Sequence, residues 1–161
     1  MNPINVIGIG QGKRDLTPAH LALIRGSDLL VGGRRHLNMF PEHKGETLVI
    51  TGAIDPVIDQ IKKNMRHKKV VVLASGDPLF YGIGSTLARS IDKQHLVIHA
   101  NISSIAAGFA AIGEPWHDAK MVSLHGKACQ TFPFSSLADE TKAAFLTDQT
   151  MNPAYIASML I

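Results

Sequence analysis

The chain of 161 residues is poor in cysteine and in aromatic residues. It has one cysteine, Cys129, one tryptophan and two tyrosines. A single cysteine excludes an internal disulfide and is compatible with a reducing compartment. No apolar run approaches the roughly 18 residues of a membrane-spanning helix, and no basic-then-apolar leader opens the chain. We therefore expect an untargeted, cytoplasmic protein that has no membrane partner.

Charge is also sparse, at 18% of the residues, and the formal net charge is only +3. The basic residues are scattered, with small groups at Arg34–Arg35 and within residues 62–69. The second group alternates with apolar residues, as on the solvated face of a helix. Nucleic-acid binding favours a continuous basic face with interleaved aromatics. We therefore expect no nucleic-acid partner. The hydrophobic residues, 45% of the chain, suffice for a sizeable core.

Two familiar nucleotide motifs are missing. No segment matches the P-loop pattern GxxxxGK[ST], so phosphoryl transfer has no support. Gly8, Gly10 and Gly12 follow an apolar run, as a loop that approaches a ligand closely requires. Their third glycine comes too early for the dinucleotide fingerprint, and Gly32-Gly33 stand where that fingerprint needs an acid. This glycine loop alone leaves ligand contact and an ordinary turn both open.

The histidines form no recognised metal motif. His95 and His99 lie four residues apart on an expected strand, where both would point to one face. His117, His125 and Cys129 are loosely spaced, and no cysteine pair or HExxH segment accompanies them. Scattered surface histidines are the simpler interpretation, and we expect no bound metal.

What the chain does have is a regular alternation of strand and helix patterns. The expected helices begin at Thr17-Pro18, Asp55-Pro56, Ile83 and Ser103-Ser104, with Thr17 and Asp55 as caps. Strands are expected at residues 5–9, 29–31, 46–50, 70–73 and 95–99. This order predicts an α/β fold with a mostly parallel sheet and helices on both faces.

A second, shorter series follows residues 114–118, which read as a linker. It contains expected strands at 121–124 and 144–147 and expected helices at 135–142 and 154–160. About 40 residues cannot cover a sheet independently. We therefore predict an N-terminal α/β domain over residues 1–114 and, over residues 115–161, a linker and the start of a truncated second α/β domain.

The stretch VVVLASGDPLFYGIGSTL, residues 70–87, organises the rest. Its four initial apolar residues do not alternate, which indicates a strand covered on both faces. Small residues and one carboxylate, Asp77, follow at the carboxyl end of that strand, where ligands of open α/β sheets bind. The stretch is either half of a nucleotide-like cofactor site or an ordinary turn.

Together, three stretches resemble the tetrapyrrole (corrin/porphyrin) methylase family. They are VIGIGQGKRDLTPAHLALIRGSDLLVGGRRHL, VVLASGDPLFYGIGSTL and NISSIAAGFAAIGEPWHDAKMVSLHGK, and they occur in the family's order over nearly the whole chain. The segments GGRRHL and SIAAGFAAIGEPWHDAKMVSLHG are similar to the precorrin-6Y C5,15-methyltransferase group of cobalamin biosynthesis, in its C5-methylating domain.

This resemblance implies a methyltransferase that uses S-adenosylmethionine to methylate a precorrin or cobalt-precorrin macrocycle at C5. It implies two α/β domains with the cofactor in the cleft between them, and a homodimer at full length. Two alternatives stay open. One is a non-catalytic module that binds a tetrapyrrole or S-adenosylmethionine, and the other is a methylase of the same fold that acts on RNA or a protein side chain.

The resemblance also implies the site residues. The cofactor contacts would be Gln11, Ser75, Gly76, Asp77, Phe80, Ser103, Ser104 and His125. The substrate contacts would be Gly8, Gly10, Gly12, Arg34 and Arg35, with the arginines pairing with substrate carboxylates. No catalytic residue is assigned. Asp77 either fixes its loop or assists proton removal after methyl transfer.

Overall fold

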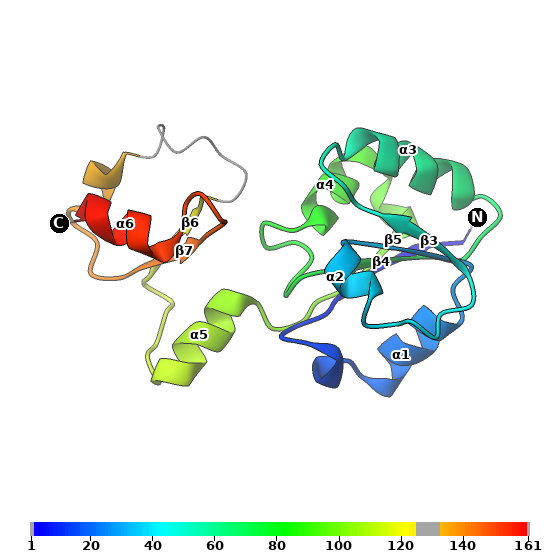
Figure 1. Ribbon diagram of the computed structural model, residues 1–161, viewed down its shortest axis with the longest axis horizontal. Helices are drawn as coiled ribbons and strands as arrows, with labels where there is room; N and C mark the ends of the chain where they lie inside the picture. The colour runs from blue at the N-terminus through cyan, green and yellow to red at the C-terminus, as the bar shows by residue number, and fades with distance from the viewer. Residues whose placement is uncertain (1, 125–132, 161) are drawn as a thin grey trace. The chain divides into compact units, whose positions relative to one another are not determined.

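The computed structural model describes residues 2–124 and 133–160, and the chain divides into two compact units, residues 1–104 and 105–161 (Figure 1). Each unit has its own sheet. The domain division expected at residue 114 stays a prediction. Within the described residues, no helix has the length and apolar character needed to cross a membrane.

A five-stranded sheet forms the first unit, and all of its strand pairs are parallel. The strands are β1 (Ile4–Gly8), β2 (Leu29–Gly32), β3 (Glu46–Val49), β4 (Val70–Ala74) and β5 (Leu96–His99). Their spatial order is β3-β2-β4-β1-β5, so β4 is the central strand, and the three interior strands β2, β4 and β1 are almost entirely buried. The prediction of a mostly parallel α/β sheet is confirmed.

Helices cover both faces of this sheet, as predicted (Figure 1). The helix α1 (Pro18–Arg25) lies on one face, and α3 (Asp55–Asn64) and α4 (Ile83–Ser90) lie on the other. Shorter segments are η1 (Lys13–Asp15), α2 (Arg34–Leu37) and η2 (Lys93–His95). Thr17 caps α1 as expected, because its hydroxyl accepts the His20 N–H. The expected cap at Asp55 is wrong, since Ile54 is the N-cap of α3 and Asp55 lies inside the first turn.

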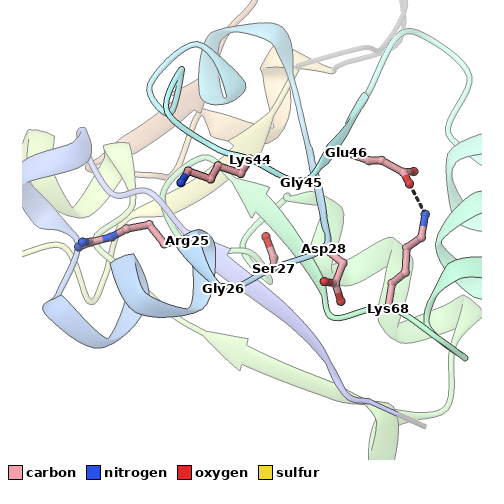
Figure 2. A pocket seen from close by; sticks show the side chains of 8 residues that line it. All are labelled: Arg25, Gly26, Ser27, Asp28, Lys44, Gly45, Glu46 and Lys68. Atoms are coloured by element: carbon pink, nitrogen blue, oxygen red, sulfur yellow. Dashed lines mark hydrogen bonds and ion pairs between the residues drawn. The ribbon is translucent and has the colours of Figure 1, made fainter.

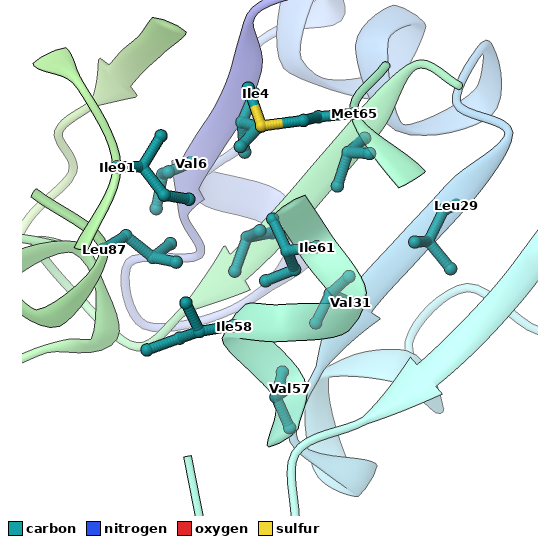
Figure 3. Close-up of a cluster of buried hydrophobic side chains, with 12 residues drawn as sticks. Ile4, Val6, Leu29, Val31, Val57, Ile58, Ile61, Met65, Leu87 and Ile91 are labelled. Carbon is teal, nitrogen blue, oxygen red and sulfur yellow. The ribbon is translucent and has the colours of Figure 1, made fainter. Parts of the chain in front are cut away.

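Alternating strand residues supply two separate cores. Val70 and Val72 point to the α3 and α4 face, whereas Val71 and Leu73 point to the α1 face. Figure 3 shows the first core, in which Ile58 and Ile61 of α3 pack toward the strands. Since both faces of β4 are apolar, the run at residues 70–73 needs no alternation, which is why it was predictable from sequence.

The second unit contains a two-stranded parallel sheet, β6 (Lys120–Ser123) with β7 (Ala143–Leu146). Its other elements are α5 (Ser104–Ile112), η4 (Phe134–Leu137) and α6 (Pro153–Leu160). The helix expected at residues 135–142 is wrong, because only the short η4 forms there. The Lys142 carbonyl accepts a hydrogen bond from the Lys120 N–H, so this part of the chain already extends the β6–β7 ladder.

Candidate functional site

The strand order reverses direction between β1 and β4. After β1 the chain crosses one face through α1 to β2, and after β4 it crosses the other face through α4 to β5. Because these connections run in opposite directions, the loops after β1 and β4 diverge from neighbouring strand ends. Ligands of open α/β sheets bind at this point, beyond the carboxyl ends of the strands. We call the loops at this edge, residues 9–16, 33–36, 75–82 and 100–103, the carboxyl-edge loops.

Glycine backbone holds three of these loops in contact. Gly10 and Gly76 form an isolated antiparallel bridge, and both have left-handed φ angles, +67° and +52°. A Cβ atom at Gly8 would overlap the Gly76 carbonyl oxygen. A Cβ atom at Gly76 would lie 3.0 Å from the Ser103 Cα, in the loop after β5. The structure therefore brings together residues from the predicted substrate and cofactor sets.

A side-chain amide fastens two of the carboxyl-edge loops. Asn101 Nδ2 donates to the carbonyl oxygens of Gly8 and Asp15, at 3.1 Å each, and its Oδ1 accepts the Ile102 N–H at 2.8 Å. The Asp15 carboxylate accepts the Gln11 N–H at 2.7 Å. The sequence prediction missed Asn101 and Asp15. An asparagine two residues after the end of a strand was the available signal, since its side chain readily bonds nearby backbone.

The outer part of the glycine loop is open. Gln11 is exposed, and a Cβ atom at Gly12 would have no heavy-atom neighbour within 4 Å. The φ of Gly12 is 163°, an extended conformation that any residue adopts. The three glycines of the motif therefore differ: Gly8 and Gly10 are required by close packing or backbone conformation, and Gly12 is not.

Asp77 stabilises the loop after β4. Its Oδ1 accepts the Leu79 N–H at 2.8 Å, and its carbonyl accepts the Phe80 N–H at 3.2 Å. This geometry supports the loop-fixing role, while a role in proton removal stays an untested alternative. Phe80 is partly buried and meets Tyr81 edge-on, with ring centroids 4.9 Å apart.

An open pocket of about 490 Å³ lies beside that loop. Two glycines allow the loop to fold closely onto the start of α4, because a Cβ atom at Gly82 or Gly84 would lie only 2.6 Å from the Pro78 carbonyl oxygen. The pocket is lined by Leu79, Phe80, Tyr81, Gly82, Ser85, Thr86 and Arg89. Of the predicted site residues that the structure describes, Phe80 alone lines it.

The arginine segment reaches the same edge through α2, which follows β2 after a single residue, Gly33. Arg35 Nη2 donates to Ser75 Oγ at 3.3 Å, and His36 Nε2 lies 3.1 Å from the same oxygen. Arg35 therefore connects the predicted substrate set to the predicted cofactor set. The residue Arg34 is exposed, and its side chain has no hydrogen bond or ion pair within the described residues.

His36 is a third residue that the sequence prediction missed. Its side chain is buried, and burial together with the nearby Arg35 cation lowers its pKa below the ordinary 6.5. The ring is therefore neutral near pH 7. Gly32 lies next to the ring: a Cβ atom there would lie 3.2 Å from the Leu73 Cβ of β4 and 3.5 Å, an ordinary contact distance, from the His36 Cβ.

The remaining predicted residues are only partly placed. Ser103 lies beside Gly76, Ser104 begins α5, and His125 lies outside the described residues. His95 belongs to η2 and only His99 to β5, so the expectation that both face one side of a strand is wrong. In residues 2–124 and 133–160, no group of three or more His, Cys, Asp or Glu residues could hold a metal ion.

A second pocket, of about 460 Å³, lies at the amino-terminal edge of the sheet (Figure 2). It is formed by residues that immediately precede β2, β3 and β4, together with Glu46, the first residue of β3. Lys68 and Glu46 form an ion pair of 2.6 Å in its wall. No predicted site residue within the described part of the chain lies here, so the carboxyl-edge loops are the candidate site.

Comparisons with known proteins give a consistent picture. A family model described as Tetrapyrrole (Corrin/Porphyrin) Methylases matches residues 3–161. Cobalt-precorrin-7 C(5)-methyltransferase from Salmonella typhimurium is 38% identical over 159 residues, which cover 98% of this chain and 77% of that protein. Precorrin-6Y C(5,15)-methyltransferase [decarboxylating] from Sinorhizobium sp is 31% identical over 165 residues, which cover 98% of this chain and 38% of that protein.

A solved structure shows the same fold. Uroporphyrin-III C-methyl transferase from Thermus thermophilus, complexed with S-adenosyl homocysteine, superposes with a TM-score of 0.61 and 20% identity. The superposition covers 76% of this chain and 59% of that one. At this identity the likeness establishes the fold alone.

Proposed function

We infer the function from one premise: the chain belongs to the tetrapyrrole (corrin/porphyrin) methylase family. Its relatives are methyltransferases, and we propose that this chain transfers a methyl group from S-adenosylmethionine to a precorrin or cobalt-precorrin macrocycle. We propose C5 as the methylated position, because both relatives described above carry a C5 activity in their names.

One structural observation carries the proposal: the loops that resemble the family's cofactor and substrate segments converge where the strand order reverses. Gly10 of the loop after β1 bridges Gly76 of the loop after β4, and Arg35, which follows β2, donates to Ser75. These loops present small residues, backbone groups and the exposed hydroxyl of Ser75. Such groups suit a ligand that must be oriented rather than attacked by a protein nucleophile.

The residues present fit the proposed ligands. The space beside Gly12 is free of neighbouring heavy atoms within 4 Å of a Cβ position, so a ligand can approach the backbone there. The guanidinium groups of Arg34 and Arg35 are suited to the acetate and propionate groups of a tetrapyrrole. When bound, S-adenosylmethionine supplies a sulfonium methyl group that accepts an electron pair from the electron-rich macrocycle carbon.

The task of this chain is therefore alignment. Orientation of two reactants in one site supplies about 7–11 kcal/mol of barrier reduction. Asp77 contributes by holding the Leu79 N–H and so fixing the loop after β4. Asn101 contributes by fastening the loops that follow β1 and β5.

Methyl transfer to a precorrin mixture, with and without inserted cobalt, tests the function. We expect the product mass to increase by one methyl group in place of one hydrogen. With ¹³C-methyl S-adenosylmethionine, the product's NMR spectrum should place the label on C5. Transfer to another ring carbon would contradict the C5 assignment and leave the class of reaction intact. No transfer to any tetrapyrrole, by a folded chain that binds S-adenosylhomocysteine, would contradict the substrate class.

A further inference from the structure

The hydroxyl of Ser75 has two protein partners although the residue itself is exposed. Arg35 Nη2 lies 3.3 Å from Ser75 Oγ, and His36 Nε2 lies 3.1 Å from it. A serine hydroxyl has one proton to donate and two lone pairs that accept. Which of these the protein uses determines what Ser75 offers to a ligand.

Arg35 occupies one lone pair, since a guanidinium group only donates. The role of His36 depends on which ring nitrogen carries the proton. Its Nδ1 is buried and has no hydrogen-bond partner within the described residues. Buried N–H groups without an acceptor are rare, whereas an unprotonated ring nitrogen leaves no donor unsatisfied. The neutral ring is therefore protonated at Nε2, and this N–H donates to Ser75.

We propose that His36 is a positioning residue: together with Arg35 it occupies both lone pairs of Ser75 Oγ and leaves Ser75 as a hydrogen-bond donor for a carboxylate of the bound ligand. The identity of the ligand rests on the proposed function. A carboxylate is the matching group because it accepts the Ser75 proton and pairs with the exposed Arg35 cation. The methyl donor has one carboxylate in its amino-acid part, and the tetrapyrrole has several.

Calorimetric titrations of the full chain distinguish these sources. The probes are S-adenosylhomocysteine, its analogue 5′-deoxy-5′-(3-aminopropylthio)adenosine, which lacks the carboxylate, and uroporphyrin III as a tetrapyrrole polycarboxylate. If the methyl donor supplies the carboxylate, Ser75→Ala should weaken S-adenosylhomocysteine binding tenfold or more and leave the analogue unaffected. If the tetrapyrrole supplies it, the loss should appear with uroporphyrin III instead. Unchanged affinity for both carboxylate ligands would overturn the proposal.

Two substitutions at His36 test the positioning role. His36→Gln keeps an N–H donor near the position of Nε2 and should retain most of the affinity, whereas His36→Leu should lose as much as Ser75→Ala. Equal losses of affinity in both His36 variants would show that a hydrogen-bond donor at this position does not determine the affinity, and would overturn the positioning role. Ser27→Ala is the matched control, because Ser27 donates to the Ile24 carbonyl at the opposite edge of the sheet. Thermal unfolding of each variant verifies that it is folded.

A measurement without ligand separates this inference from the proposed function. Nitrogen-15 NMR of the imidazole rings should show His36 as the Nε2–H tautomer at pH 7.5, and the Nδ1–H tautomer would overturn the proposal. If the wild-type chain binds none of the three probes, the proposed function is overturned, and so is the proposal that Ser75 donates to a ligand carboxylate. The tautomer would then decide the arrangement of His36 and Ser75 by itself.

Discussion

Gly8→Ala tests how closely the carboxyl-edge loops depend on backbone packing. An added Cβ would overlap the Gly76 carbonyl oxygen and lie 3.1 Å from both Asn101 Cβ and Pro78 Cδ. These atoms belong to two other loops, and the overlapped oxygen is backbone, so no side-chain rotation relieves the clash. Overpacking of this kind costs about 1–3 kcal/mol, and we expect the upper end because the backbone itself must move.

A loss of about 3 kcal/mol corresponds to a fall in Tm of roughly 6–12 °C for a chain of this length. Gly12→Ala is the matched comparison. Gly12 has extended backbone and no heavy atom within 4 Å of its Cβ position, so the free energy of unfolding should change by less than about 0.5 kcal/mol. Circular dichroism during heating measures both variants. Equal Tm values for Gly8→Ala and Gly12→Ala would refute this account of the loop.

Two further predictions concern the side chains that hold this edge. Asn101→Ala should lower the free energy of unfolding by about 2–3 kcal/mol in urea titrations, because two carbonyls and the Ile102 N–H lose their partner. Asn101→Asp should cost at least as much, since a carboxylate would face both carbonyl oxygens, and a neutral effect would contradict the bonding described. The folded-state pKa of His36 lies below 6.5. The stability that depends on its neutral ring is therefore fully present above pH 6.5 and is lost as the pH falls below that value. Urea titrations from pH 7.5 to 5.5 should therefore give a shallower pH dependence for His36→Gln than for wild type, by at most about 1.4 kcal/mol per pH unit; an unchanged slope would contradict the lowered pKa.

The sheet could be predicted from sequence because its signals are local. The apolar run at residues 70–73 contains its own evidence of burial on both faces, and Thr17-Pro18 contains the evidence for the start of α1. The helix expected at residues 135–142 failed because the Lys142 carbonyl pairs with Lys120 of β6, a contact between segments far apart in the chain. Local patterns do not report such pairing.

The candidate site was predictable as loops but not as contacts. Residue types and spacing singled out the glycines and the SGDP segment as candidate loops, and the resemblance to the family implied their roles. The roles of Asn101 and His36 depend on which strands become neighbours: Asn101 bonds Gly8 across 93 positions, and His36 lies beside Ser75 across 39. Because the β3-β2-β4-β1-β5 order sets both contacts, they became visible only with the fold.

The central claim is that the carboxyl-edge loops bind the methyl donor. Titration of the ¹⁵N-labelled chain with S-adenosylhomocysteine, followed by amide NMR, tests it most directly. We predict shift changes concentrated at residues 10–12, 75–80 and 101–103, with little change at residues 25–28 and 44–46 around the opposite pocket. Changes confined to that opposite edge, or none at millimolar ligand in a folded chain, would contradict the account.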